Sequence, residues 1–175
     1  HDDFRVAAVT TEEGGSLLFF RVRDQGNLVV SLGPLAKREE PFTLTTRYSG
    51  RHDPAPVDQE LVQVGSSSVD FEDAFVDRPP LVYSNRTAWY PRPPNEDFAT
   101  ARVRIESPAG WLGVMGGELV SLHTEGGRTR AEYRLEQPGK FLTAVVGRLA
   151  DVGLRQEGEQ AVRGFAGPRT RGETL

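Results

Sequence analysis

The chain has 175 residues and a net charge of -4, with acidic and basic residues interspersed, so it supports one domain with a substantial core or two small ones. This balance excludes a broad electrostatic attraction to nucleic acid or anionic lipid. The absence of cysteine excludes disulfide scaffolds, thiolate metal sites and cysteine nucleophiles.

Short strands separated by turns are the predicted elements of the first fifty residues. Strands are expected at Phe4–Val9, Leu17–Arg23 and Asn27–Leu32. The glycine-containing turns between these strands predict a meander. A polar connector with a Gly-Pro breaker follows. The next segment alternates, with Phe42, Leu44, Thr46 and Tyr48 on one face, which is typical of a half-buried strand.

Residues Ser49 to Pro80 break this rhythm with a long polar connection that ends in a double proline. Connections of this length are uncommon inside a compact domain unless they are functional or contain a further strand. We therefore expect one short strand or helical turn here, with a surface path for the remainder.

The most informative stretch is Leu81–Leu122, which contains both tryptophans and a proline-rich knot. It also contains the clearest alternating strand, beginning at Ala99 and Thr100 and ending at Pro108. Gly116 and Gly117 then predict a hairpin.

Two further strands are predicted in the C-terminal third. Glu125–Gly127 is a turn that joins Glu118–Leu122 to Arg128–Glu136, because alternation continues on both sides of it. In the second of these strands, the expected inward residues are Ala131, Tyr133 and Leu135, and the outward ones are Arg130, Glu132 and Arg134. Phe141–Arg148 is almost continuously apolar and predicts a central strand covered on both faces.

These patterns predict an all-β fold, an antiparallel sandwich of about eight to eleven strands with long loops and little helix. No long amphipathic helix separates the strands, which disfavours a parallel α/β fold. We expect one sandwich domain at 1–150. Residues 151–175 are expected to form a final edge strand and a polar tail that leads towards a missing downstream domain.

Catalytic motifs are absent from the sequence. The three histidines, His1, His52 and His123, do not form the H-E-x-x-H pattern in which two imidazoles reach one zinc ion. The G-x-S-x-G elbow and the glycine-rich phosphate loops are missing as well. We assign no catalytic, cofactor-binding or metal-binding residue, and no segment is apolar enough to predict a membrane span.

Two other kinds of site stay open as alternatives. A glycosidase-like carboxylate pair could come from the acids near the central stretch, namely Glu72, Asp73, Asp77, Glu96 and Asp97. The aromatic residues Trp89, Tyr90 and Trp111 could form a sugar-stacking platform, although packing in the core explains them as well. A platform requires that Trp89 or Trp111 be substantially exposed.

The central stretch resembles the N-terminal β domain of the gluzincin aminopeptidases, the zinc peptidase family of alanyl aminopeptidase and leukotriene hydrolase. Tyr90-Pro91 resembles the family's opening pair, and Pro93–Asp97 resembles its acidic, proline-containing knot. The segments FTLTTRYSG and FLTAVVGRL resemble two further strands of that domain. The structural signature comprises Trp89, Tyr90, Pro91, Ala99, Thr100, Pro108 and Gly117.

This resemblance implies a saddle-like sandwich and a non-catalytic role. The chain would support and shape the substrate cleft of a larger zinc aminopeptidase-like protein, in contact with a downstream catalytic domain that binds the zinc and the peptide substrate. The family's cysteine and its substrate-contacting glutamine are absent here, and Asn85 is not given that role. The alternative is an independent carbohydrate- or protein-binding module. No cellular compartment is assigned.

Overall fold

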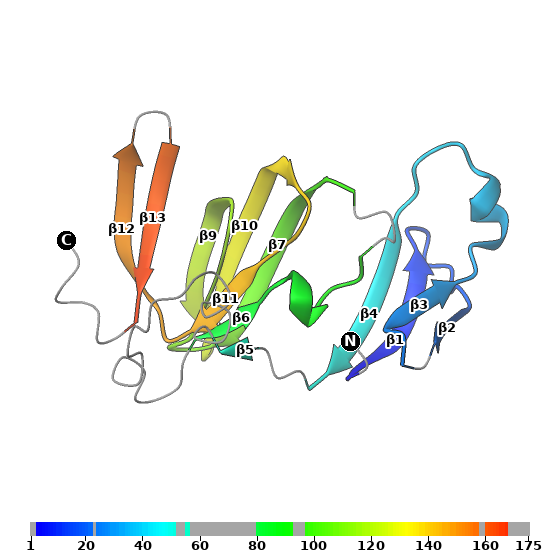
Figure 1. Cartoon of the computed structure of the whole chain (residues 1–175), viewed down its shortest axis with the longest axis horizontal. Helices are drawn as coiled ribbons and strands as arrows, with labels where there is room; N and C mark the ends of the chain where they lie inside the picture. Colours follow the sequence, from blue (N-terminus) through cyan, green and yellow to red (C-terminus); the bar gives the residue numbers. More distant parts are fainter. Residues whose placement is uncertain are drawn as a thin grey trace, which may run out of the picture. The chain divides into compact units, whose positions relative to one another are not determined.

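The computed structural model describes residues 3–22, 24–51, 55–56, 80–92, 97–157 and 160–167. Regular structure in these residues consists of strands and two short 3-10 helices (Figure 1). All strand pairs are antiparallel, which confirms the predicted all-β class. The described residues contain thirteen strands, more than expected, because several strands have only 2 to 4 residues.

Contacts along the chain define two compact units. The first unit is His1–Asp53 with Trp89–Pro91, and the second unit is Pro54–Ala88 with Arg92–Leu175. The boundary expected near residue 150 does not coincide with the division into these two units. It stays a prediction.

The first unit contains two strand pairs. β1 (Phe4–Thr11) pairs with β4 (Leu44–Gly50), and β2 (Phe19–Val22) pairs with β3 (Asn27–Val30). Val9, only 1% exposed, lies opposite Thr46 and forms the core of the first pair. The predicted meander is therefore wrong for β1, which forms its ladder with β4. A single bridge, between Thr10 and Ser16, links β1 to the segment before β2.

Sequence patterning was only partly right around β4. Thr46 and Tyr48 are half-buried as predicted, whereas Phe42 and Leu44 are exposed. The connector before β4 forms a 3-10 helix, η1 (Gly33–Lys37), which has proline in its first turn and buries Leu35. Proline favours a helix start because its φ is already helical and its missing N–H would have no partner there.

The second unit contains the sandwich. One sheet has the order β7-β10-β9 (Figure 1). The other has the order β5-β6-β11-β8. The first comprises β7 (Ala99–Pro108), β10 (Arg128–Gly139) and β9 (Glu118–Glu125). The second comprises β5 (Ala55–Pro56), β6 (Leu81–Tyr83), β11 (Ala144–Gly147) and β8 (Leu112–Met115). The strand predicted at Phe141–Arg148 is shorter in the structure, and its central position is confirmed, because β11 lies between β6 and β8.

The two sheets pack through β8. The hydroxyl of Tyr133 in β10 donates a hydrogen bond to the carbonyl oxygen of Gly113 in β8 at 3.1 Å. A Cβ atom on Gly113 would collide with the side chain of Ile105 in β7, so only glycine permits this approach of the sheets. The predicted inward face of β10 is confirmed at Ala131 and Tyr133, which are 1% and 2% exposed.

Gly116 and Gly117 form a corner between sheets. The hairpin expected there is wrong, because β8 pairs with β11 while β9 pairs with β10. Gly117 has a φ of 104°, and a Cβ atom on it would lie 2.6 Å from the carbonyl oxygen of Arg134. The predicted hairpin between β9 and β10 is confirmed, with its turn at Gly126 and Gly127.

The C-terminal described residues form a ribbon of two strands, β12 (Ala150–Glu157) and β13 (Gln160–Ala166). This corrects the prediction of a single edge strand beyond Asp151. In the long connection between Ser49 and Pro80, β5 is the expected short strand, and residues 52–54 and 57–79 lie outside the described residues. None of the described helices is long and apolar enough to cross a membrane.

Candidate functional site

The segment singled out by its aromatic residues follows a short 3-10 helix, η3 (Asn85–Thr87). The hydroxyl oxygen of Ser84 caps this helix by accepting a hydrogen bond from the backbone N–H of Arg86 at 3.3 Å. Ala88 then adopts a left-handed φ of 44°. This conformation is unfavourable for a residue with a Cβ atom, and it ends the helix just before Trp89.

Aromatic contacts anchor Trp89 within the first unit. The Tyr48 hydroxyl donates a hydrogen bond to the Trp89 carbonyl oxygen at 2.8 Å. The rings of Trp89 and Tyr90 meet edge to face with centroids 4.8 Å apart, and those of Phe4 and Tyr48 do so at 5.4 Å. Burial raises the pKa of Tyr48, which keeps its hydroxyl protonated as a donor. These contacts suit a packing role for Trp89 and Tyr90.

Trp111 belongs to the second unit, in the turn between β7 and β8. Its backbone N–H donates to the Pro108 carbonyl oxygen at 3.0 Å, and its own carbonyl oxygen accepts from the Ser107 hydroxyl at 2.7 Å. Trp89 and Trp111 are both half-buried. Neither residue therefore has the substantial exposure that was expected of a sugar-stacking platform.

The other residues of the proposed signature lie at strand ends and corners. Ala99 and Thr100 begin β7 and are exposed, and Pro108 ends it. Gly117 forms the corner after β8, and Pro91 is exposed beside Tyr90. Pro93–Glu96, most of the predicted knot, lie outside the described residues. The family signature itself stays a prediction.

Acidic and histidine side chains do not gather into a metal-binding group in the described part of the chain. Asp97 is described, and its Oδ1 accepts a hydrogen bond from the Phe98 backbone N–H at 2.9 Å. The other acids considered for a glycosidase pair fall outside the described residues, as do His1 and His52. His123 is exposed on β9. No group of three or more potential metal ligands occurs among the described residues.

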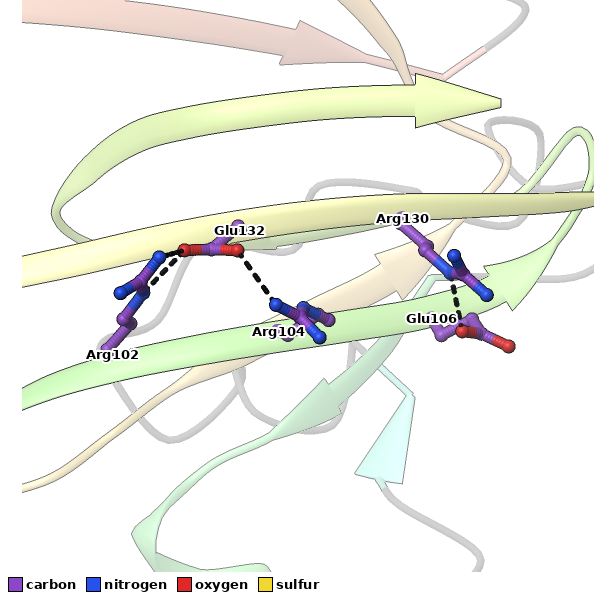
Figure 2. A network of polar contacts seen from close by, with 5 residues as sticks. All are labelled: Arg102, Arg104, Glu106, Arg130 and Glu132. Carbon is purple, nitrogen blue, oxygen red and sulfur yellow. Dashed lines mark hydrogen bonds and ion pairs between the residues drawn. The ribbon is translucent and has the colours of Figure 1, made fainter. Parts of the chain in front are cut away.

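A network of arginine and glutamate side chains covers the outward face of β7 and β10 (Figure 2). Glu132 accepts hydrogen bonds from Arg102 and, at 3.3 Å, from Arg104. Glu106 accepts from Arg128 and Arg130, each at 2.8 Å. Strand register explains these contacts: Glu132 lies opposite Arg104, and Glu106 lies opposite Arg130. Directly opposed side chains of a sheet are near neighbours.

Glu132 is buried although it belongs to the outward face. The residue is only 8% exposed, while the Arg102 and Arg104 side chains that cover it are 73% and 68% exposed. Its pKa is lowered, first by the hydrogen bond from Arg102, against the opposing effect of desolvation. The hydrogen bond from Arg130 lowers the pKa of Glu106 in the same way.

This network, the arginine–glutamate face, has the chemistry of a stabilising surface. Arginine stays protonated at any physiological pH, so it cannot act as a general base. The paired carboxylates stay ionised because their pKa values are lowered. Sequence reasoning identified the outward residues of β10 but missed the network. A signal for it exists: both strands carry Arg-x-Arg-x-Glu, at 102–106 and 128–132.

Comparisons with known proteins give matches in structure only. No protein-family model matches the sequence, and no curated protein matches it. An M1 zinc metallopeptidase from Deinococcus radiodurans is similar in fold, with a TM-score of 0.62 and 18% identity over 93% of this chain and 37% of that chain. A mutant of a two-domain M1 zinc metallopeptidase bound to L-arginine gives a TM-score of 0.61, with the same identity and coverage.

A mutant of the Deinococcus radiodurans enzyme bound to a Tyr-Ser-Ala substrate is similar as well, with a TM-score of 0.60 and 17% identity over the same shares of the two chains. The chain thus has a fold found in M1 zinc metallopeptidases, and it spans about 37% of their length. The fold expected from the resemblance to the gluzincin aminopeptidases is confirmed.

Proposed function

We propose that this chain is a non-catalytic β-sandwich domain of a larger M1-type zinc metallopeptidase. One observation carries the proposal: nearly the whole chain matches these enzymes in fold, yet the match takes up only 37% of their length. The zinc ion, the catalytic base and most contacts with the substrate would then belong to another part of the polypeptide.

The role proposed for this domain is to support and shape the substrate cleft of the catalytic domain. Loops fixed on a rigid β scaffold are a common way to position such a surface. The close approach of β8 to β7 and β10, together with the arginine–glutamate face, supports this role, because both features restrain the sandwich of the second unit. The peptide substrate would be bound only by the full-length protein.

Peptidase assays on this chain and on the longer natural protein test the proposal. We expect the longer protein to release amino acids from the N-terminus of peptides, and a zinc chelator to abolish this release. We expect the 175-residue chain, shown to be folded by circular dichroism, to release none at the same concentration. Zinc-dependent hydrolysis by the chain alone would overturn the proposal, and so would a longer protein without a metallopeptidase domain.

A further inference from the structure

The three-stranded sheet of the second unit ends in two edge strands, β7 and β9, which differ in regularity. Among the described residues, each of them pairs on one side only, with β10. β7 faces β10 from Ala101 to Pro108 without a bulge. β9 contains a register shift, since Leu119 and Ser121 lie opposite successive residues of β10 and Val120 is an extra residue between them. Bulges protect an edge from further pairing, so β7 is the open edge of this sheet.

The outward side chains of β7 give this open edge a local positive charge. Arg102 and Arg104 are 73% and 68% exposed, and both contact a single carboxylate, that of Glu132 (Figure 2). Two cations thus share one anion, and each guanidinium has more N–H donors than it uses there. A strand added to the edge would place its own outward side chains directly beside the two arginines. Acidic residues fit these positions because they supply the missing negative charge.

The inward side chains of β7 are less covered than those of β10. Ile105 and Val103 are half-buried, whereas the residues opposite them, Ala131 and Tyr133, are buried. Apolar side chains on an added strand would therefore extend the core layer over Val103 and Ile105. Successive residues of a strand point to opposite faces of a sheet. The strand that fits the open edge is consequently one in which apolar and acidic residues alternate.

We propose that the open edge of β7 binds an extended segment of a partner protein in which acidic and apolar residues alternate. The segment joins the sheet as a fourth strand, and its backbone groups form hydrogen bonds with the outer side of β7. In such strand addition the main-chain bonds supply affinity, and alternate side chains supply specificity. Carboxylates beside Arg102 and Arg104 select the acidic residues. This binding requires only residues of this chain, so it is independent of the peptidase role proposed above.

A second copy of the chain fits this edge less well. Two β7 strands paired antiparallel about a twofold axis at Val103 would place Arg102 of one copy opposite Arg104 of the other. An axis at either arginine would place that arginine opposite itself, and like charges directly opposed destabilise a strand pair. An axis at Ile105 would pair Arg104 with Glu106, whose carboxylate already accepts from two arginines of β10.

Titration with a synthetic peptide tests the proposal. The probe is a short capped peptide in which valine and glutamate alternate. We expect saturable binding to the 175-residue chain, with NMR shifts of backbone amides concentrated in 99–108 rather than in 118–125. A peptide of the same composition with its glutamates grouped should bind at least about tenfold more weakly, because only alternation places the charges on one face. No binding of the alternating peptide, or shifts concentrated in β9, would overturn the proposal.

Methylation of the peptide backbone separates strand addition from simple attraction between charges. Only every second N–H of an added strand faces β7. N-methyl groups on one alternate set of residues should therefore weaken binding at least about tenfold, whereas those on the other set should weaken it less than about threefold. Equal weakening by the two sets would show that the peptide does not bind as a strand of this sheet.

Substitutions in the chain locate the charges that select the peptide. Arg102→Gln and Arg104→Gln should each weaken binding by about threefold, since an exposed ion pair contributes little by itself. Arg128→Gln is the matched control: its side chain is 63% exposed and also contacts a glutamate, but it belongs to β10, the central strand. This control should leave affinity unchanged, and circular dichroism should show all three variants folded. Equal weakening by the three variants would overturn the proposal, as would dimers of the chain that Arg104→Gln strengthens.

Discussion

Gly117 occupies the corner at which the chain passes from β8 in one sheet to β9 in the other. Its positive φ is unfavourable for other residues, and the carbonyl oxygen of Arg134 fills the place of a Cβ atom. We predict that Gly117→Ala lowers the free energy of unfolding by more than about 1 kcal/mol, because both strain and a steric clash oppose alanine. Chemical denaturation followed by circular dichroism measures this loss.

The neighbouring Gly116 supplies a matched control. A Cβ atom on Gly116 would meet nothing within 4 Å, and its φ is not positive. Gly116→Ala should therefore change the free energy of unfolding by less than about 0.5 kcal/mol. Equal losses for the two variants would show that flexibility of the Gly-Gly pair, rather than the geometry of Gly117, determines stability at the corner.

Individual residues also show what alternation along a strand cannot predict. The pattern correctly places Glu132 on the outward face of β10, and yet the residue is buried. Its burial arises from Arg102 and Arg104, which lie across it and come from another strand, 30 and 28 residues earlier in the chain. The cause of this burial is tertiary, and the local sequence of β10 does not contain it. Leu35 is also buried, in a 3-10 helix that forms where the composition predicts only a polar connector.

In the β7–β10 pair, each of the glutamates Glu106 and Glu132 accepts hydrogen bonds from two arginines of the facing strand. Arg102 and Arg134 are directly opposed, a destabilising arrangement for like charges unless anions lie beside them. Glu132 accepts from Arg102, and Glu118 accepts from Arg134 at 2.8 Å, which supplies those anions. The stability of this pair of strands should therefore depend on ionised carboxylates.

This dependence predicts a loss of stability in acid. The pKa of Glu132 is lowered in the folded protein, so its contribution is complete above about pH 4.3, the ordinary pKa of glutamate, and is lost as the pH falls through the lower folded value. Glu132→Gln removes the charge at every pH. We expect the variant to be less stable than the wild type at neutral pH and the difference to shrink below about pH 4.

Denaturation midpoints measured across this pH range provide the test, with Glu118→Gln as the control. The Glu118 side chain is 61% exposed, whereas that of Glu132 is 11% exposed, so the control removes an ion pair that is largely screened by water. Its effect on the free energy of unfolding should be small. A difference between Glu132→Gln and the wild type that persists unchanged in acid would assign the loss to packing rather than charge.

The positions of single strands were predicted more successfully than the pairing between strands. The strands β7 and β10 follow from alternation, and the β9–β10 hairpin follows from its two turn glycines. The pairing of β8 with β11 does not follow, because a glycine pair that permits a hairpin equally permits a corner between sheets. Local periodicity identifies a strand and its inward face, whereas long-range contacts decide which sheet it joins.

For the molecule as a whole, the sequence indicated an antiparallel sandwich and its likeness to one enzyme family, and both agree with the fold. It did not predict that Trp89–Pro91 belongs with the first fifty residues, since that assignment depends on contacts such as the one from Tyr48. The division of the chain into two units has a practical consequence. Each unit contains one of the two tryptophans of the chain, Trp89 in the first and Trp111 in the second.

These tryptophans can report on the two units separately. Trp111→Phe leaves Trp89 as the reporter of the first unit, and Trp89→Phe leaves Trp111 as the reporter of the second. Tyr48→Phe removes the hydrogen bond to the Trp89 carbonyl oxygen in the first unit, and Tyr133→Phe removes the one to Gly113 in the second. Each loss should cost about 1 kcal/mol, and more where the carbonyl oxygen is left buried without a partner.

We therefore expect selective shifts in urea denaturation followed by tryptophan fluorescence. Tyr48→Phe should lower the midpoint reported by Trp89 more than the midpoint reported by Trp111, and Tyr133→Phe should do the reverse. The cause is that each hydroxyl bonds within its own unit, so its loss destabilises that unit directly. If both substitutions moved both midpoints equally, the two units would unfold as one cooperative body, and the boundary between them would have no thermodynamic counterpart.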